Sequence, residues 1–404
     1  MQSNSCVLIL YASYGDGHLQ AARSLQESLL SQGIKRVLLL DLMAEAHPFI
    51  NDLTRFVYMQ SFKTIPHLYG WVYHITRNMK AESPFSNWLH SFGIRRLREV
   101  LEQERPQLIV HTFPQLALPH LKTRWGLTVP LINILTDYDL HGRWLHPHID
   151  HYYVPSQAMR SEAIQRGVAP AHITVTGIPL HSSFEAIPVE AEARLHKRKQ
   201  LRLEAGLDPD KKTVLLLAGA YGVLKNVRDV SEVVAQREDA QLVIICGKNE
   251  PLRRDLEKRY GSLDNVQVHG FTRRMSEWML LSDCAVTKPG GITVSECIRC
   301  GLPVFLLRPV PGQELANALY LQQQGIAEVC QSPALLAHAL SDMLDQPQRL
   351  DMMRQQMEQL QMPDAAARIA GDLVTRYMKQ TTLGTKLAPI PVLQGNARTA
   401  NVEQ

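Results

Sequence analysis

Short, almost uninterrupted apolar runs alternate with helical patterns along most of this 404-residue chain, and they come in two series. Strands of a parallel sheet have this pattern, because helices cover both faces of the sheet and bury every strand side chain. The first series predicts strands at residues 7–12, 36–40, 108–110, 131–135, 152–154 and 174–176. The second predicts strands at residues 213–217, 242–246, 266–269, 284–287 and 304–307. The expected fold class is therefore α/β, with two doubly wound, Rossmann-like domains.

A break between the two series marks the expected domain boundary. The stretch GIPLHSSFEAIP, residues 177–188, is rich in proline and fits neither pattern. We expect an N-terminal domain at 1–185, a C-terminal domain at 186–362, and a last helix at 363–380 that returns to the N-terminal domain. The tail at 381–404 has glycine and proline without periodicity, which predicts disorder. A chain of this length suffices for two large domains.

A glycine turn closed by a histidine follows the first predicted strand, in the sequence ASYGDGH at residues 12–18. A strand, a glycine turn and a helix in this order hold anions in α/β proteins, so Gly17 is a candidate ligand contact. His18 would be a neutral imidazole with a pKa of about 6.5, which suits a general base at neutral pH. Capping of the helix is the plainer alternative. The stretch GDGHLQ lacks the third small residue of a dinucleotide fingerprint, which disfavours a dinucleotide-dependent oxidoreductase.

The strongest candidate binding site lies in the second series, at residues 282–321. Two turns there each open a helix, and free amide groups at a helix N-terminus suit a diphosphate. A carboxylate one turn into the first helix could accept hydrogen bonds from both hydroxyls of a ribose, and polar side chains at the start of the second helix suit a sugar. The candidates are Lys288, Gly290, Gly291, Thr293, Glu296, Gln313, Glu314 and Asn317. An ordinary βαβα unit with two tight turns is the alternative.

Basic and aromatic residues gather before the third predicted strand. Residues 49–92 hold ten of the chain's 26 aromatic residues, and residues 55–98 hold seven cations and one acid, whereas the formal net charge of the whole chain is only +4. Cations interleaved with Trp, Tyr and Phe suit an anionic membrane surface. The candidate contacts are Phe56, Phe62, Trp71, Arg77, Lys80, Trp88, Arg95 and Arg96. Helix core with a solvated basic face is the alternative interpretation.

Two motifs, TKPGGITVSE and PGQELAN, resemble the donor-binding signature of glycosyltransferase family 28. The opening ASYGDGH resembles the lipid branch of that family, whose glycine-rich turn is also closed by histidine. Further matches are HTFP, TDYDLHGRWLHPHIDHYYVPS, VTGIPL, AGAYGVLKN and ICGKN, and together the motifs cover roughly residues 6–330. The chain is similar to the bacterial processive diacylglycerol β-glucosyltransferases and, more distantly, to the plant monogalactosyldiacylglycerol synthases.

The resemblance implies a GT-B fold, in which two Rossmann-like domains face each other across a cleft. It implies an inverting transfer of glucose from UDP-glucose to 1,2-diacylglycerol, with repeated sugar addition and neither a catalytic metal nor another cofactor. The expected partners are a UDP-hexose, diacylglycerol and an anionic membrane surface, with no nucleic acid. The expected location is peripheral, at the cytoplasmic face of the cell membrane. Two alternatives stay open, a galactosyltransferase that uses UDP-galactose and a UDP-sugar 2-epimerase of the same fold.

The resemblance also suggests roles for single residues. His18 is the expected base or a ligand of the donor phosphate, and Asp137, in LTDYDLH, orients His18 or acts as the base itself. Gly219, in AGAYG, and Phe271, after the strand at 266–269, are expected near the donor, Phe271 at the place that receives the uracil. For Asp137, a helix cap is the plainer alternative.

Overall fold

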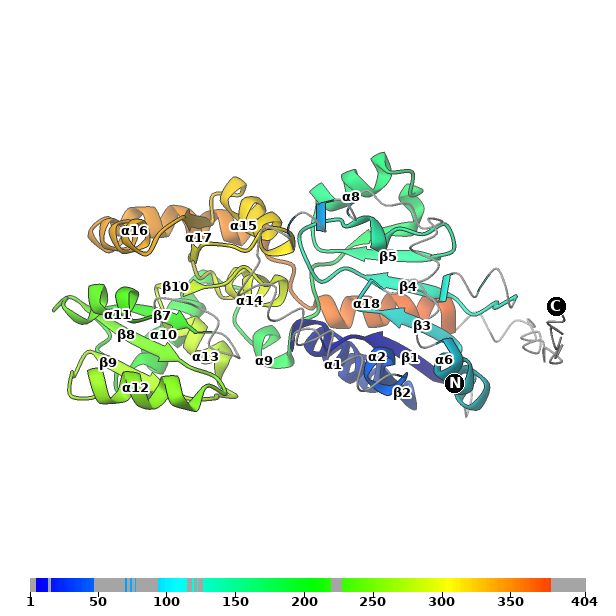
Figure 1. The fold of residues 1–404 in the computed structure, drawn as a ribbon, viewed down its shortest axis with the longest axis horizontal. Coiled ribbons are helices and arrows are strands. Elements are labelled where there is room, and N and C mark those ends of the chain that lie inside the picture. The colour runs from blue at the N-terminus through cyan, green and yellow to red at the C-terminus, as the bar shows by residue number, and fades with distance from the viewer. Residues whose placement is uncertain are drawn as a thin grey trace, which may run out of the picture.

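Two six-stranded parallel sheets form the frame of the protein, one in each half of the chain (Figure 1). The computed structural model describes residues 5–13, 16–46, 70, 73–74, 77, 94–114, 118–119, 122, 126–218 and 227–378. The first sheet contains β1 (Cys6–Tyr11), β2 (Arg36–Asp41), β3 (Leu108–His111), β4 (Leu131–Ile134), β5 (His151–Val154) and β6 (Ile173–Val175), in the order β2-β1-β3-β4-β5-β6. The second contains β7 (Lys212–Leu217), β8 (Ala240–Ile245), β9 (Val266–His269), β10 (Cys284–Thr287), β11 (Val304–Leu307) and β12 (Ala327–Cys330), in the order β12-β11-β10-β7-β8-β9.

Helices cover the faces of each sheet. The first half of the chain has α1 (Asp16–Ser31), α2 (Leu42–Ala46), α6 (Ile94–Glu104), α8 (Gln157–Gln165) and α9 (Ser182–Glu185), with the short turns η1 (Gly142–Trp144) and η2 (Pro170–His172). The second half has α10 (Ala191–Glu204), α11 (Val227–Ala235), α12 (Glu250–Tyr260), α13 (Met275–Leu281), α14 (Gly291–Cys300), α15 (Gln313–Gln323), α16 (Pro333–Asp345) and α17 (Pro347–Leu360). The helices α18 (Ala365–Leu373) and η3 (Val374–Met378) follow.

All eleven predicted strands are present, with ends within two residues of those expected, so the predicted α/β fold with two doubly wound domains is confirmed. Strand β12 is present but was not predicted from the sequence. Its four residues form an edge strand, in which Glu328 and Val329 are only half-buried. An edge strand need not be apolar on both sides, and β12 therefore lacks the continuous apolar run that marked the others.

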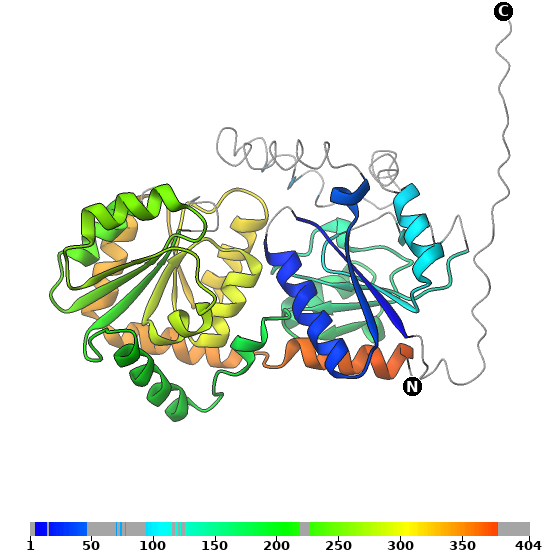
Figure 2. The same cartoon turned by 90° about the horizontal axis from the view of Figure 1, so that it is seen from below.

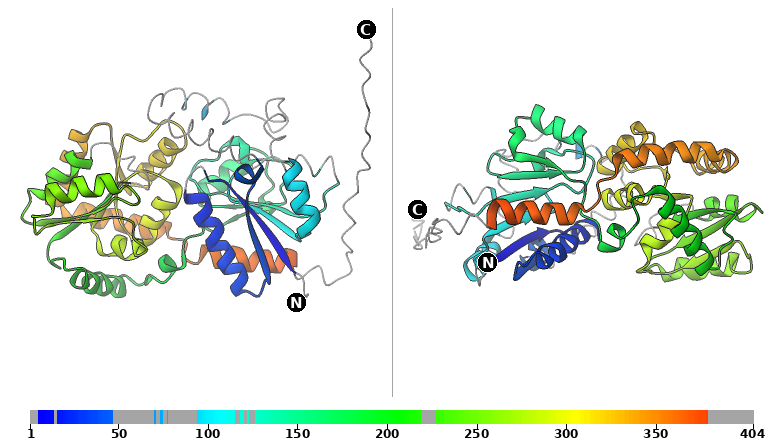
Figure 3. Two further views of the ribbon diagram at one scale, coloured as in Figure 1. Left: turned by 60° about the horizontal axis from the view of Figure 1, so that its bottom comes forward. Right: turned by 180° about the vertical axis from the view of Figure 1, so that it is seen from behind.

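Helix α1 shows how the sequence positions the two domains. Ala22, Leu25 and Leu29 recur at helical spacing and pack on the first sheet, while Ala21 belongs to the core cluster of the second domain. Helix α18 packs against α1 and belongs to the same core cluster, so the end of the described chain lies in the first domain (Figures 2 and 3). The chain passes between the domains twice, once near Glu185 and once near Asp364. A hydrogen bond joins the two connections, because the Asp364 amide donates to Glu185 Oε2 over 2.7 Å. None of the helices in the described part of the chain combines the length and apolar character needed to cross a bilayer.

Candidate active site

The carboxyl ends of the strands in the first sheet lie against the N-terminal end of α14. The strand order reverses between β1 and β3 and again between β7 and β10, and α/β sheets bind ligands at such points. A Cβ on Gly17 would lie 3.1 Å from Cγ1 of Ile292, and a Cβ on Gly291 would clash with the Thr136 carbonyl oxygen. Gly291 thus makes room for the backbone of the first domain rather than for a ligand, whereas Gly290 faces open space.

His18 lies in the first turn of α1, after β1, and its ring is oriented by two threonines. Nδ1 lies 2.8 Å from the Thr112 carbonyl oxygen and 2.9 Å from Thr136 Oγ1. Because a carbonyl oxygen only accepts hydrogen bonds, Nδ1 carries the proton and Nε2 keeps its lone pair. Burial lowers the pKa of His18, although the nearby Asp137 carboxylate opposes this shift. The imidazole is therefore neutral at neutral pH, with a basic Nε2.

Asp137 follows β4 and is buried at the domain interface. Its Oδ1 accepts a hydrogen bond from Asn317 Nδ2 over 3.0 Å. Burial raises the pKa of Asp137, while His18 and the amides of Asn317 and Gln313 favour its ionised form. His18 Nδ1 donates the hydrogen bonds that orient the ring to the Thr112 carbonyl oxygen and Thr136 Oγ1, so the influence of Asp137 on His18 is electrostatic. Sequence reasoning missed both threonines, although Thr112 belongs to the HTFP motif and Thr136 precedes Asp137.

The N-terminal end of α14 presents free amide groups and one buried carboxyl. Its N-cap, Gly290, has no side chain to satisfy those amides, and Thr293 is half-buried one turn further on. Glu296 is buried and makes no hydrogen bond to any residue that the structure describes. Burial alone raises the pKa of Glu296 to about 8. A buried carboxyl without partners is suited to accept hydrogen bonds from a ligand.

Most of the remaining candidate residues for binding the sugar donor lie around the start of α15. Lys288 Nζ lies 3.4 Å from Glu314 Oε1, and Glu314 Oε2 accepts from the Val310 amide over 3.3 Å. Gln313 begins the helix and favours the ionised form of Asp137. Asn317 is fully buried, with its side chain bonded to protein groups on all sides. We therefore find the Asn317 amide engaged in the domain interface, rather than open to a sugar as expected.

Two other candidate residues for binding the sugar donor, Phe271 and Gly219, do not belong to α14 or α15. Phe271 follows β9 and its side chain is 65% exposed, so a ligand near it would find an open aromatic surface. Gly219 lies outside the described residues.

The two cysteines of the sequence CIRC, Cys297 and Cys300, are buried, and burial raises the pKa of both thiols. In the described part of the chain, no three His, Cys, Asp or Glu side chains lie close enough together to hold a metal ion.

Part of the basic and aromatic segment is bound to the first domain. Tyr73 donates to Asp139 Oδ2 over 2.5 Å, and Arg77 pairs with Asp139 Oδ1 over 2.8 Å. Asp139 is buried, whereas the Arg77 side chain is 36% exposed. A Cβ on Gly70 would clash with Pro311, so Gly70 also lies against the loop before α15. Arg77 thus forms an ion pair within the protein. The composition of the segment could not show this, because it does not give the partner of each cation.

The described cations at the end of this segment, Arg95, Arg96 and Arg98, lie near acids that the sequence count did not include. Arg96 pairs with Glu45 over 3.0 Å and with Glu99 over 3.4 Å. Arg95 reaches Glu99 over 3.4 Å, but its side chain is 96% exposed and remains open to a membrane surface. The candidates Phe56, Phe62, Trp71, Lys80 and Trp88 lie outside the described residues.

Arg77→Gln should lower the stability of the protein. Breaking a buried ion pair costs about 3–5 kcal/mol; because Arg77 is 36% exposed, we expect about 1–3 kcal/mol here, measured by chemical unfolding. The matched control is Arg95→Gln, which should leave stability unchanged and weaken binding to anionic vesicles about fivefold at low salt. Unchanged stability of the Arg77 variant would contradict an anchoring role for the pair.

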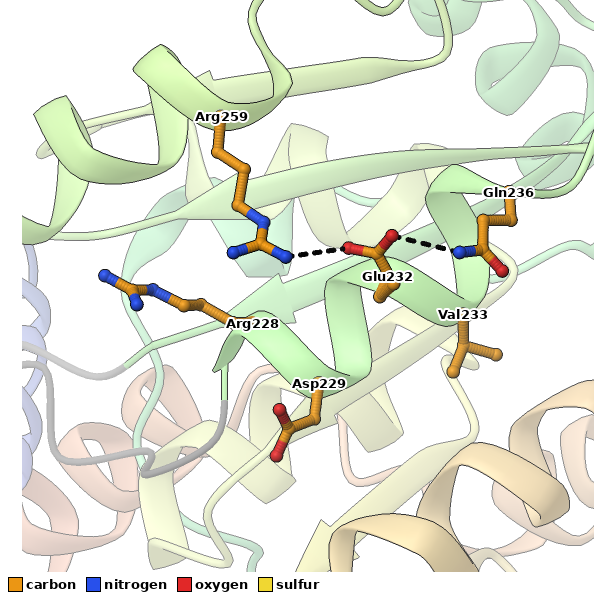
Figure 4. A pocket seen from close by; sticks show the side chains of 6 residues that line it. All are labelled: Arg228, Asp229, Glu232, Val233, Gln236 and Arg259. Carbon is orange, nitrogen blue, oxygen red and sulfur yellow. Dashed lines mark hydrogen bonds and ion pairs between the residues drawn. The ribbon is translucent and has the colours of Figure 1, made fainter.

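A surface hollow of about 510 Å³ lies on the second domain between α11 and α12 (Figure 4). Three of its charged side chains, Arg228, Glu232 and Arg259, form ion pairs. Arg259 pairs with Glu232 over 3.4 Å, Gln236 donates to the same carboxylate over 2.9 Å, and Arg228 pairs with Asp255 over 2.7 Å. None of these residues belongs to the domain interface, so the candidate site remains the one formed by β1, β3, β4, α14 and α15.

Comparison with known proteins agrees with this geometry. Residues 18–180 match the family model of monogalactosyldiacylglycerol (MGDG) synthase, and residues 213–369 match the C-terminal domain of glycosyltransferase family 28. The solved structure of MurG from Acinetobacter baumannii has a TM-score of 0.59 at 16% identity and covers 92% of this chain and 99% of that one. UDP-GlcNAc 2-epimerase from Neisseria meningitidis has a TM-score of 0.54 at 14% identity, covering 92% and 100%. The fold and the site thus define a protein of the GT-B class.

Sequence relatives identify the family within that class. The chain is 35% identical over 370 residues to a processive diacylglycerol β-glucosyltransferase from Bacillus cereus (strain B4264), covering 91% of this chain and 93% of the relative. It is 33% identical to the protein of the same name from Bacillus licheniformis, covering 93% and 96%. The chain belongs to the processive diacylglycerol β-glucosyltransferase family of glycosyltransferases.

Proposed function

We propose that the protein transfers glucose from UDP-glucose to 1,2-diacylglycerol and then adds further glucose units to the glycolipid. The observation that carries this proposal is the 35% identity, over 91% of the chain, to a relative whose name states processive β-glucosyl transfer to diacylglycerol. The geometry supports the same chemistry, because a neutral histidine of the first domain lies at the interface that also contains the N-terminal end of α14.

In the proposed step, the acceptor hydroxyl oxygen attacks the anomeric carbon of the sugar as the bond from that carbon to the diphosphate oxygen breaks. UDP leaves with the electron pair of that bond, and the hydroxyl proton passes to His18 Nε2. The other proton stays on Nδ1 and remains hydrogen-bonded to the Thr112 carbonyl oxygen and Thr136 Oγ1. Asp137 favours the imidazolium that forms. Attack from the face opposite the leaving group inverts the anomeric carbon, which gives a β-linked glucolipid.

The donor would lie along α14. The free amides around Gly291 face the diphosphate, Lys288 adds a positive charge, and Glu296 accepts from the ribose hydroxyls. We propose that these groups stabilise the leaving diphosphate without a metal ion. The acceptor would reach the first domain from a membrane surface, to which exposed cations such as Arg95 hold the protein peripherally.

Galactose is the second candidate sugar, because the family model that matches residues 18–180 is named for a galactolipid synthase. The test is to incubate the protein with vesicles that contain diacylglycerol and with UDP-glucose, UDP-galactose or UDP-N-acetylglucosamine, in the presence of EDTA. We expect a β-glucolipid only from UDP-glucose. A galactolipid alone would favour the second candidate, an epimerised UDP-sugar without lipid product would contradict both, and loss of activity in EDTA would contradict metal-free transfer.

A further inference from the structure

Asn317 is fully buried where the two domains meet, and the protein uses both hydrogens of its amide group. Nδ2 donates to Asp137 Oδ1 over 3.0 Å and to the Pro289 carbonyl oxygen over 2.9 Å. Oδ1 accepts from the Tyr138 amide over 2.8 Å. Two of these three hydrogen bonds join α15 of the second domain to the first domain. Asn317 therefore has no N–H group left for a sugar hydroxyl.

The neighbouring contacts hold this arrangement in place. The Tyr138 ring stacks on Tyr320 with 4.6 Å between ring centroids, and its hydroxyl lies 2.9 Å from Ser295 Oγ. Ser295 Oγ itself donates to the Gly291 carbonyl oxygen over 2.7 Å, so Tyr138 is the donor to Ser295. Residues 136–138 of the first domain are thus fixed between α14 and α15.

These contacts across the domain interface act on Asp137. Its carboxylate is buried and close enough to His18 to influence the charge of the imidazole. The hydrogen bond from Asn317 favours the ionised carboxylate. Because Asn317 belongs to the other domain, Asp137 receives this hydrogen bond only while the domains are in contact.

We propose that Asn317 is a positioning residue, which holds the Asp137 carboxylate beside His18 across the domain interface and so completes the catalytic pair only when the donor domain is in place. The inference rests on the proposed function, because it assigns His18 and Asp137 to transfer. It differs from a direct sugar contact, which would make Asn317 a determinant of donor affinity.

The test is Asn317→Ala, with turnover measured on diacylglycerol vesicles and binding measured by calorimetry. We expect kcat to fall about tenfold to hundredfold, the range for loss of a hydrogen bond to a charged group. The ratio of the affinities for UDP-glucose and UDP should stay within about twofold of the parent. A fall of tenfold or more in that ratio would show a sugar contact and would overturn the proposal.

A double-mutant cycle tests whether Asn317 acts through Asp137. In an Asp137→Asn background, Asn317→Ala should lower the remaining kcat by less than about twofold. Effects that multiply would overturn the proposal. Asn317→Asp keeps the side-chain volume if the alanine variant folds poorly, and it should lose at least as much turnover, because a carboxylate would then face Asp137. If the Asn317→Asp variant had the same turnover as the parent, that result would also overturn the proposal.

The pH profile supplies a readout that a merely structural role would not change. Removal of the Asn317 N–H should raise the pKa of Asp137, so the acidic limb of the kcat profile should move to higher pH. Ser295→Ala is the matched control, since it removes a hydrogen bond of the same interface without touching Asp137, and its acidic limb should stay in place. An unmoved limb in the Asn317 variant, or an equal shift in both, would overturn the proposal. Absence of glycolipid from the parent enzyme would contradict the proposed function instead, and the ratio of binding affinities would still decide the role of Asn317.

Discussion

His18→Ala should lower kcat by about 10²–10⁴-fold, the usual cost of losing a general base. The affinity for UDP-glucose should change little, because the free amides and Glu296, which we propose bind the donor, lie in the second domain. The physical reason is the tautomer. Hydrogen bonds from Nδ1 to Thr112 and Thr136 leave Nε2 as the basic atom, and burial keeps the ring neutral. Steady-state kinetics with glycolipid detection, together with calorimetry for donor binding, measures both quantities.

Thr136→Val tests the orientation of the His18 ring separately from the loss of the base. It removes the hydroxyl that lies 2.9 Å from His18 Nδ1 and leaves the Thr112 carbonyl in place, so turnover should fall less than in His18→Ala. If the loss in His18→Ala appeared wholly as weaker donor binding, His18 would be a phosphate ligand, and the base would lie elsewhere in the site.

Above pH 8, where the Glu296 carboxyl is ionised, Glu296→Ala should weaken the binding of both UDP and UDP-glucose by roughly tenfold to hundredfold, which corresponds to about 1.5–3 kcal/mol for hydrogen bonds to a charged group. Equal losses for the two ligands are expected, because the ribose is common to both. Glu296 has no hydrogen-bond partner among the residues that the structure describes, so the variant should fold as the parent does. Unchanged affinity by calorimetry would remove Glu296 from the donor site.

Substitution of the same carboxyl should change the stability of the protein by an amount that depends on pH. Its pKa is about 8 in the folded protein against 4.5 as the ordinary value, so the folded state prefers the protonated form. The stability associated with that proton is present below pH 4.5 and is lost as the pH rises through 8. Glu296→Gln should therefore raise Tm by about 2–4 °C at pH 8.5, equivalent to roughly 1 kcal/mol, and by nothing at pH 4.5. A gain that persists at acidic pH would point to a cause other than ionisation.

The sequence by itself determined where most strands and helices form and where the candidate ligand-binding ends of helices occur. Apolar runs such as TVLLL and LVII are local signals, because most residues of a strand buried between helices are apolar. The turns before His18 and Gly291 were equally visible, since glycine and the start of a helical pattern are properties of neighbouring residues. The motifs around those turns also led to the family, which the relatives then showed.

The tertiary structure decided which side chains meet. Thr112 and Thr136 orient His18 from 94 and 118 residues away, and Asn317 reaches Asp137 across 180 residues and a domain boundary. Arg77 counted as a membrane cation in the sequence, yet its partner is the buried Asp139. No local pattern encodes such pairs, because they depend on the order of strands in a sheet and on how two domains face each other. A hydrogen bond requires a particular donor and acceptor within about 3 Å, and only the folded chain brings them to that distance.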